Sequence, residues 1–185
     1  MILLAFDTAG PHCAAAVLRG GKVAAARLEP MARGQSERLM PMLEALLAEA
    51  GAGWGDLARI GVGTGPGNFT GIRIGVSAAR GLAMALGVPA IGVTSTDALL
   101  DGAPAGAWAA IPAPRGQAFV ARAGEAPALR PAADVPAGAL VPRAGANPAV
   151  AVARIAAARR PGPRPAPTYA RPPDAVPARP APPPA

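Results

Sequence analysis

The chain opens with a pattern of apolar residues that predicts three strands. Ile2–Phe6 is a short continuous apolar run and predicts a buried strand, and 12–19 and 22–28 predict two more. Gly20 and Gly21 separate the last two runs, and glycine pairs readily adopt the positive φ angles of a tight hairpin. We therefore expect an antiparallel meander at the start of the chain.

A helical pattern follows the three predicted strands. The apolar residues that share one face of this helix are Leu39, Met42, Leu43, Leu46, Leu47 and Ala50. Gly51 provides a stop signal. Pro41 lacks a backbone N–H, so the helix either begins at this residue or is kinked there.

The next segment alternates between short apolar runs and longer helical patterns. Residues 60–63 predict a strand, 70–86 a helix, 90–93 a strand and 94–100 the start of another helix. Together with the first three strands, this alternation predicts an α/β layered lobe with a mixed sheet.

Beyond Asp101 the pattern is weaker. Residues 107–111 and 117–122 predict a strand pair, and 150–159 predict a helix. Eleven of the 25 residues from Pro161 to Ala185 are proline, which predicts an extended, disordered tail. We therefore expect an N-terminal lobe over 1–103, a smaller and truncated second lobe over 104–160, and a tail over 161–185.

The net charge of +7 changes the picture only at the C-terminal end. Residues 143–185 hold seven arginines and one acid, which is typical of a solvated tail but also allows a salt-sensitive attraction to RNA phosphates. The whole chain has only six aromatic residues, and the sequence reveals no surface on which bases of single-stranded RNA would stack.

Cysteine and histidine are too few for several kinds of site. Cys13 is the single cysteine and His12 the single histidine, so the sequence offers no internal disulfide, no three-ligand metal site and no Ser-His-Asp triad. The lone cysteine fits a reducing cytoplasm, and the apolar run at the N-terminus is too short for a membrane span. We therefore expect a cytoplasmic protein that needs no metal and does not bind a membrane.

The segment 63–77 has the sequence GTGPGNFTGIRIGVS. Glycines that lead from a strand into a helix can present backbone amides to an anion, although such turns are more often structural. Within the helix, Gly71, Gly75 and Ala79 recur every four residues, and each glycine costs about 1 kcal/mol relative to alanine. This stripe predicts close approach of another backbone, either inside the domain or across a subunit interface.

Residues 65–99 resemble the signature of the bacterial TsaB (YeaZ-like) family, whose usual wording is GPGSFTGLRIG followed by an alanine- and glycine-rich helix. Further matches are Asp7-Thr8-Ala9, the SERLMP segment at 36–41, the run 111–120 and the PTYAR segment at 167–171. The chain differs from the family pattern at Gln35, Pro112 and Gln117.

The resemblance implies an actin-like, Hsp70-like (ASKHA, ribonuclease H-like) fold and no catalysis by this subunit. Family members pair with the catalytic subunit TsaD, or with themselves, through their first two helices, and the ATPase TsaE engages the pair. Their complex forms N6-threonylcarbamoyladenosine in tRNA beside the anticodon, so tRNA would be contacted indirectly. The residues that this implies for the interface are Leu39, Met42, Leu43, Leu46, Gly71, Gly75, Val76 and Ala79.

The resemblance also points to Asp7 and Thr8, because actin-like folds place a phosphate-proximal acid at the end of the first strand. These two residues are candidates for weak ATP or ADP binding, and the alternative is that Asp7 only caps the following turn. Other interpretations that stay open are a weak ATPase, a degenerate paralogue of the family, a metallopeptidase-like protein and a direct RNA-binding protein.

Overall fold

A computed structural model describes residues 1–170, so the part of the predicted tail at 171–185, including Arg171 and Arg179, lies outside the described residues. The main element is a five-stranded mixed sheet in the order β3-β2-β1-β4-β5. Its strands are β1 (Ile2–Asp7), β2 (His12–Arg19), β3 (Lys22–Pro30), β4 (Leu57–Gly63) and β5 (Ala90–Val93). The first three are antiparallel neighbours, as predicted, and β4 and β5 are parallel to β1.

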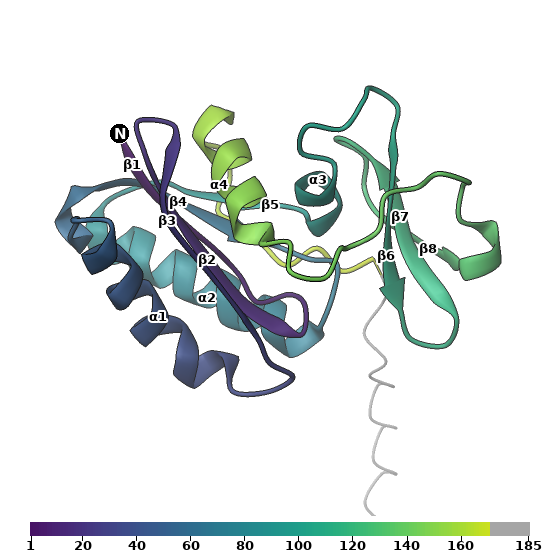
Figure 1. Cartoon of the computed structure of the whole chain (residues 1–185), viewed down its shortest axis with the longest axis horizontal. Helices are drawn as coiled ribbons and strands as arrows, with labels where there is room; N and C mark the ends of the chain where they lie inside the picture. The colour runs from purple at the N-terminus through teal and green to yellow at the C-terminus, as the bar shows by residue number, and fades with distance from the viewer. Residues whose placement is uncertain (171–185) are drawn as a thin grey trace, which may run out of the picture.

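Helices cover both faces of this sheet (Figure 1). One face carries α1 (Gln35–Glu49) and α2 (Phe69–Leu86), and the opposite face carries α4 (Pro148–Ala158), with the short α3 (Ser95–Leu99) beside it. The α/β class predicted from the alternating pattern is thereby confirmed. Pro41 lies inside α1 rather than at its start.

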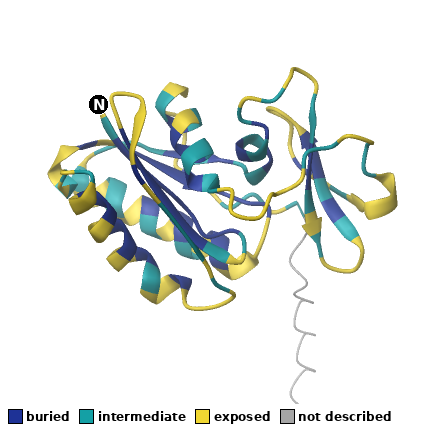
Figure 2. Cartoon of the chain, in the orientation of Figure 1, coloured by how far each residue is buried: buried dark blue, intermediate teal, exposed yellow. Residues whose placement is uncertain are grey.

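Apolar side chains are buried on both faces of the five-stranded sheet. The alternation along β1 and β2 explains this, because successive residues of a strand point to opposite faces. Leu4, Phe6 and Val17 are buried against α1 and α2. Leu3 and Ala5 are buried on the other face, against α4. Figure 2 shows the result, with buried residues along the sheet and exposed residues on the outer sides of the helices.

A second, antiparallel sheet has the order β6-β7-β8. It consists of β6 (Trp108–Ala113), β7 (Gln117–Arg122) and β8 (Ala128–Pro131), of which the sequence pattern predicted the first two. Two single 3-10 turns complete the elements, at Trp54–Asp56 and Ala132–Asp134. Although α4 falls within the range 104–160, it packs on the five-stranded sheet and not on this small one.

The C-terminal segment 161–170 differs from the predicted disordered tail. Pro165 is buried and would contact a Cβ added at Gly92 of β5. The backbone N–H of Thr168 donates to the carbonyl of Thr64 at 2.8 Å, directly after β4. Proline prevents regular structure here, but the segment still packs along the edge of the sheet.

The glycines of α2 have opposite environments. Gly71 and Gly75 are buried against Thr8, the residue that follows β1. A Cβ at Gly71 would overlap the carbonyl oxygen of Thr8. A Cβ at Gly75 would lie 2.8 Å from Thr8 Oγ1. Gly81 is exposed, and nothing lies within 4 Å of an added Cβ. The close approach that the stripe predicts therefore occurs inside the chain.

The same substitution at two positions of α2 should have opposite effects. We expect Gly81→Ala to raise the free energy of unfolding by about 0.5–1 kcal/mol, because alanine is the better helix former. We expect Gly71→Ala to lower it by about 1–3 kcal/mol, because the new methyl group meets a backbone carbonyl that cannot move aside. Urea unfolding measures both, and equal effects at the two sites would contradict the packing described above.

Cys13 lies on β2 in the core and is fully buried. Burial, and secondarily the negative charge of Glu29, raise the pKa of its thiol from 9.0 to about 11. Because the thiolate is the reactive form, we expect Ellman's reagent at pH 8 to label the native protein far more slowly than the protein in urea. Equal labelling rates would show that β2 opens readily in the native state.

Candidate functional site

The side chain of Asp7, at the end of β1, is engaged within the chain. It is 2% exposed. Its Oδ1 accepts a hydrogen bond from the backbone N–H of Ala9 at 2.9 Å, and Nε2 of His12 lies 2.8 Å from the same oxygen. The structure thus places Asp7 where the resemblance expects an acid, with one of its two oxygens already paired.

The side chain of Thr8 is also engaged within the chain. Its hydroxyl is buried and donates to the carbonyl oxygen of Gly71 at 2.6 Å, in the first turn of α2. Thr8 therefore contributes to the attachment of α2 to the sheet, whereas Asp7 holds the turn that follows β1. Weak nucleotide binding at these two residues stays a prediction.

Neighbouring backbone packs closely against the glycine-rich turn before α2. A Cβ at Gly67 would overlap the carbonyl oxygen of Ala9, and Asn68 N–H donates to that same oxygen at 2.6 Å. Ser95 N–H donates to the carbonyl of Gly65 at 2.7 Å, which ties the turn to the start of α3. The Asn68 side chain caps α2 by accepting from Gly71 N–H at 2.9 Å. These contacts favour the structural interpretation of the turn over the anion-binding one.

The structure buries all the residues that the resemblance suggested for the interface. On α1 these side chains pack into the core beneath the helix, and on α2 they face the end of β1 and the neighbouring strands. They are therefore covered by the chain itself, and a partner would have to use other residues of the same helices. The residues concerned are Leu39, Met42, Leu43, Leu46, Gly71, Gly75, Val76 and Ala79.

A different stripe of small residues is exposed on α2. Ser77, Gly81 and Ala85 recur every four residues and are all exposed, so they lie on one side of the helix, away from the core. Glu37, Met40 and Glu44 are exposed on α1, which packs beside α2. The sequence contained this second stripe, but only burial distinguishes it from the first.

An aromatic pair joins two distant parts of the chain. Phe69, at the start of α2, stacks on Tyr169 with 5.2 Å between the ring centroids. Arg73 lies over the Phe69 ring, with 3.8 Å from Cζ to the centroid, and its Nε donates to the Tyr169 hydroxyl at 2.8 Å. Because the two rings are 100 residues apart in sequence, no pattern along the chain indicated this contact.

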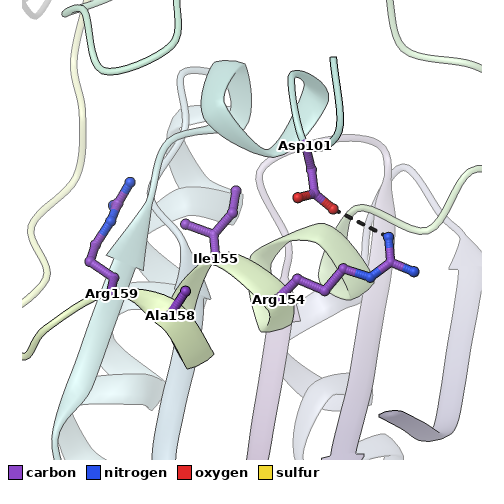
Figure 3. Close-up of a pocket in the computed structure, with 5 residues that line it drawn as sticks. All are labelled: Asp101, Arg154, Ile155, Ala158 and Arg159. Atoms are coloured by element: carbon purple, nitrogen blue, oxygen red, sulfur yellow. Dashed lines mark hydrogen bonds and ion pairs between the residues drawn. The ribbon is translucent and has the colours of Figure 1, made fainter. Parts of the chain in front are cut away.

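Hollows lie beside α4 and beside α2 on the described part of the surface. The first, of about 390 Å³, is bordered by the C-terminal half of α4 and by Asp101, which pairs with Arg154 at 3.3 Å (Figure 3). The second, of about 450 Å³, lies between the C-terminal half of α2 and residues 162–165. Arg80 and Arg164 line the second hollow together with apolar residues.

Among residues 1–170, no three His, Cys, Asp or Glu side chains are grouped so that they could hold a metal ion. Within the same range, none of the helices combines the length and the apolar character that crossing a membrane requires.

Known proteins resemble part of this chain in sequence and most of it in structure. Residues 29–135 match the family described as "TsaD: tRNA N6-adenosine threonylcarbamoyltransferase". The Escherichia coli (strain K12) protein named "tRNA threonylcarbamoyladenosine biosynthesis protein TsaB" is 38% identical over 103 residues, which are 56% of this chain and 44% of that protein. The chain thus matches less than half the length of this curated relative.

Two solved structures from Pseudomonas aeruginosa share the fold over most of the chain. YeaZ aligns with a TM-score of 0.71 at 28% identity, covering 84% of this chain and 90% of that one. An uncharacterized protein described as similar to peptidase YEAZ aligns with a TM-score of 0.75 at 27% identity, covering 92% and 99%. With the mixed sheet, these neighbours show the actin-like (ASKHA) fold. The chain therefore belongs to the family whose model is described as TsaD, and within it the chain is a TsaB/YeaZ-like protein.

Proposed function

We propose that this chain is a non-catalytic subunit of the cytoplasmic complex that forms N6-threonylcarbamoyladenosine in tRNA, and that it binds and activates the TsaD subunit. The observation that carries the proposal is the uncovered outer side of α1 and α2, two adjacent helices on one face of the sheet (Figure 1). The matched family region, residues 29–135, contains both helices.

The exposed stripe on α2 supports a helix-to-helix contact. Small residues at Ser77, Gly81 and Ala85 let another helix approach closely, and the space above Gly81 is open. Met40 on the neighbouring helix α1 is 37% exposed and offers an apolar side chain to a partner. A helix surface of small residues can pack closely against a partner helix without rearrangement of the core.

The internal contacts of Asp7 and Thr8 support the non-catalytic part of the proposal. The Thr8 hydroxyl binds α2, the Asp7 carboxylate binds the turn after β1, and the glycine-rich turn is packed against Ala9. A subunit that acts by binding uses its rigid surface, whereas phosphate chemistry would need these groups to face a ligand. TsaE binding and formation of a homodimer through the same helices are part of the proposal as further associations.

The substitution Gly81→Leu should block the helix contact and leave the fold intact. The leucine would project into open space above α2, and leucine is a better helix former than glycine. We expect the affinity for the TsaD protein of the same source to fall about tenfold or more, as measured by light scattering coupled to size exclusion and by titration calorimetry.

A matched control for this experiment is Gly55→Leu. Gly55 is also exposed, with no atom within 4 Å of an added Cβ, but lies in the turn at Trp54–Asp56 and outside α1 and α2. The control should bind TsaD like the wild type. If the wild type does not associate with TsaD, or if both variants bind equally well, the proposed interface is wrong.

A further inference from the structure

The exposed aromatic pair formed by Phe69 of α2 and Tyr169 of the C-terminal segment is unusual for this chain, which has few aromatic residues. Phe69 is 45% exposed and Tyr169 is 44% exposed, although each ring is held by the other and by Arg73. Their fixed geometry means that little side-chain freedom remains to be lost when a flat ligand stacks on them.

The surroundings of the pair are basic. Neither α2 nor the segment 161–170 contains an acidic residue, and no acidic residue occurs anywhere between Asp56 and Asp97. The same two elements carry Arg73, Arg80 and Arg164. A polyanion that approaches along these two elements therefore meets arginines and no carboxylate from either element.

The second hollow extends this surface along the helix. Residues 162–165 border the hollow near the C-terminal end of α2, and Tyr169 stacks near the N-terminal end. The segment between them thus runs antiparallel beside the helix. Phe69 and Arg80 are eleven residues apart, which corresponds to about 16 Å along an α-helix.

We propose that this aromatic-basic track, formed by α2 and residues 162–169, binds single-stranded RNA. An unpaired base would stack on the Phe69–Tyr169 pair, and Arg73, Arg80 and Arg164 would attract the flanking phosphates. The inference deepens the proposed function and depends on it, because the RNA would be an unpaired region of the tRNA that the complex modifies.

A protein partner fits the aromatic pair less well. The exposed neighbours of Phe69 on α2 and in the preceding turn are polar or small, namely Gly67, Asn68, Thr70 and Arg73. Protein interfaces generally have a continuous apolar centre, whereas a base needs only one exposed ring face. Met84, the next large exposed apolar residue on α2, is about 22 Å away along the helix.

Fluorescence anisotropy with a short labelled single-stranded RNA tests the stacking. We expect Phe69→Ala and Tyr169→Ala each to weaken binding roughly 5- to 150-fold, the range for one lost base–aromatic contact. Tyr169→Phe keeps the ring but loses the hydrogen bond from Arg73, and should bind more tightly than Tyr169→Ala. The duplex made from the same RNA should bind more weakly than the single strand, because its bases are already paired and stacked.

Salt dependence tests the arginines separately from the rings. The double substitution Arg80→Ala with Arg164→Ala should reduce the slope of log affinity against log salt by about 1.4, at about 0.7 per phosphate contact on a single strand. Arg143→Ala is the matched control, since Arg143 is exposed on a loop outside both elements, and its slope should equal that of the wild type.

Thermal unfolding of each variant checks that the fold is kept. If Phe69→Ala fails to fold, Phe69→Trp preserves a ring at this position, and single-stranded RNA should quench the added indole fluorescence. The proposal is overturned if the wild type does not bind single-stranded RNA at low salt, or if removing either ring leaves the affinity unchanged.

The same variants distinguish this inference from the proposed function. Loss of TsaD binding without loss of RNA binding in Phe69→Ala and Tyr169→Ala would assign the rings to a protein interface and overturn the RNA track. Failure of RNA binding with wild-type TsaD association would remove the track and leave the proposed function standing. Failure of TsaD association by the wild type would instead remove the proposed function.

Discussion

The close contact between α2 and the end of β1 is the interaction on which the rest of the structure depends. Thr8 donates to the carbonyl of Gly71, and the absence of side chains at Gly71 and Gly75 lets the helix reach the strand backbone. Two glycines in a helix are unfavourable by about 1 kcal/mol each. Burial of the adjacent apolar face and a buried hydrogen bond offset that loss.

This contact also determines which groups remain available for function. Thr8 attaches α2, Asp7 holds the turn after β1, and Gly67 of the glycine-rich turn is covered by the backbone of Ala9. The residues that suggest phosphate chemistry in the sequence thus also have structural contacts in the fold, and nucleotide binding by them stays a prediction. The proposed binding surface is instead the outer side of α1 and α2.

The periodicity of α2 gives that surface two separate sides. One side carries small exposed residues, at Ser77, Gly81 and Ala85. The side that meets the C-terminal segment carries Phe69, Arg73 and Arg80. Since 3.6 residues make one turn, a single helix can hold a protein partner on one side and a nucleic acid on another. The proposed subunit role and the proposed RNA track are therefore compatible within one element.

The sequence by itself determined the elements with strong periodicity. The alternation along β1 and β2 and the apolar face of α1 predicted buried layers that the structure confirms, since periodicity directly reports which residues share a face. It did not reveal β8, a short strand that follows Pro127 and ends at Pro131, has little apolar character and depends on pairing with β7.

Only the tertiary structure decided what each face meets. From the sequence, the stripe at Gly71 and Gly75 could have faced either a partner or the chain's own sheet. In the structure both glycines are buried against Thr8, so the stripe faces the sheet. The contact between Phe69 and Tyr169 joins residues 100 positions apart. Periodicity is a local property of the backbone, whereas the neighbour of a face is set by packing between segments that are distant in sequence.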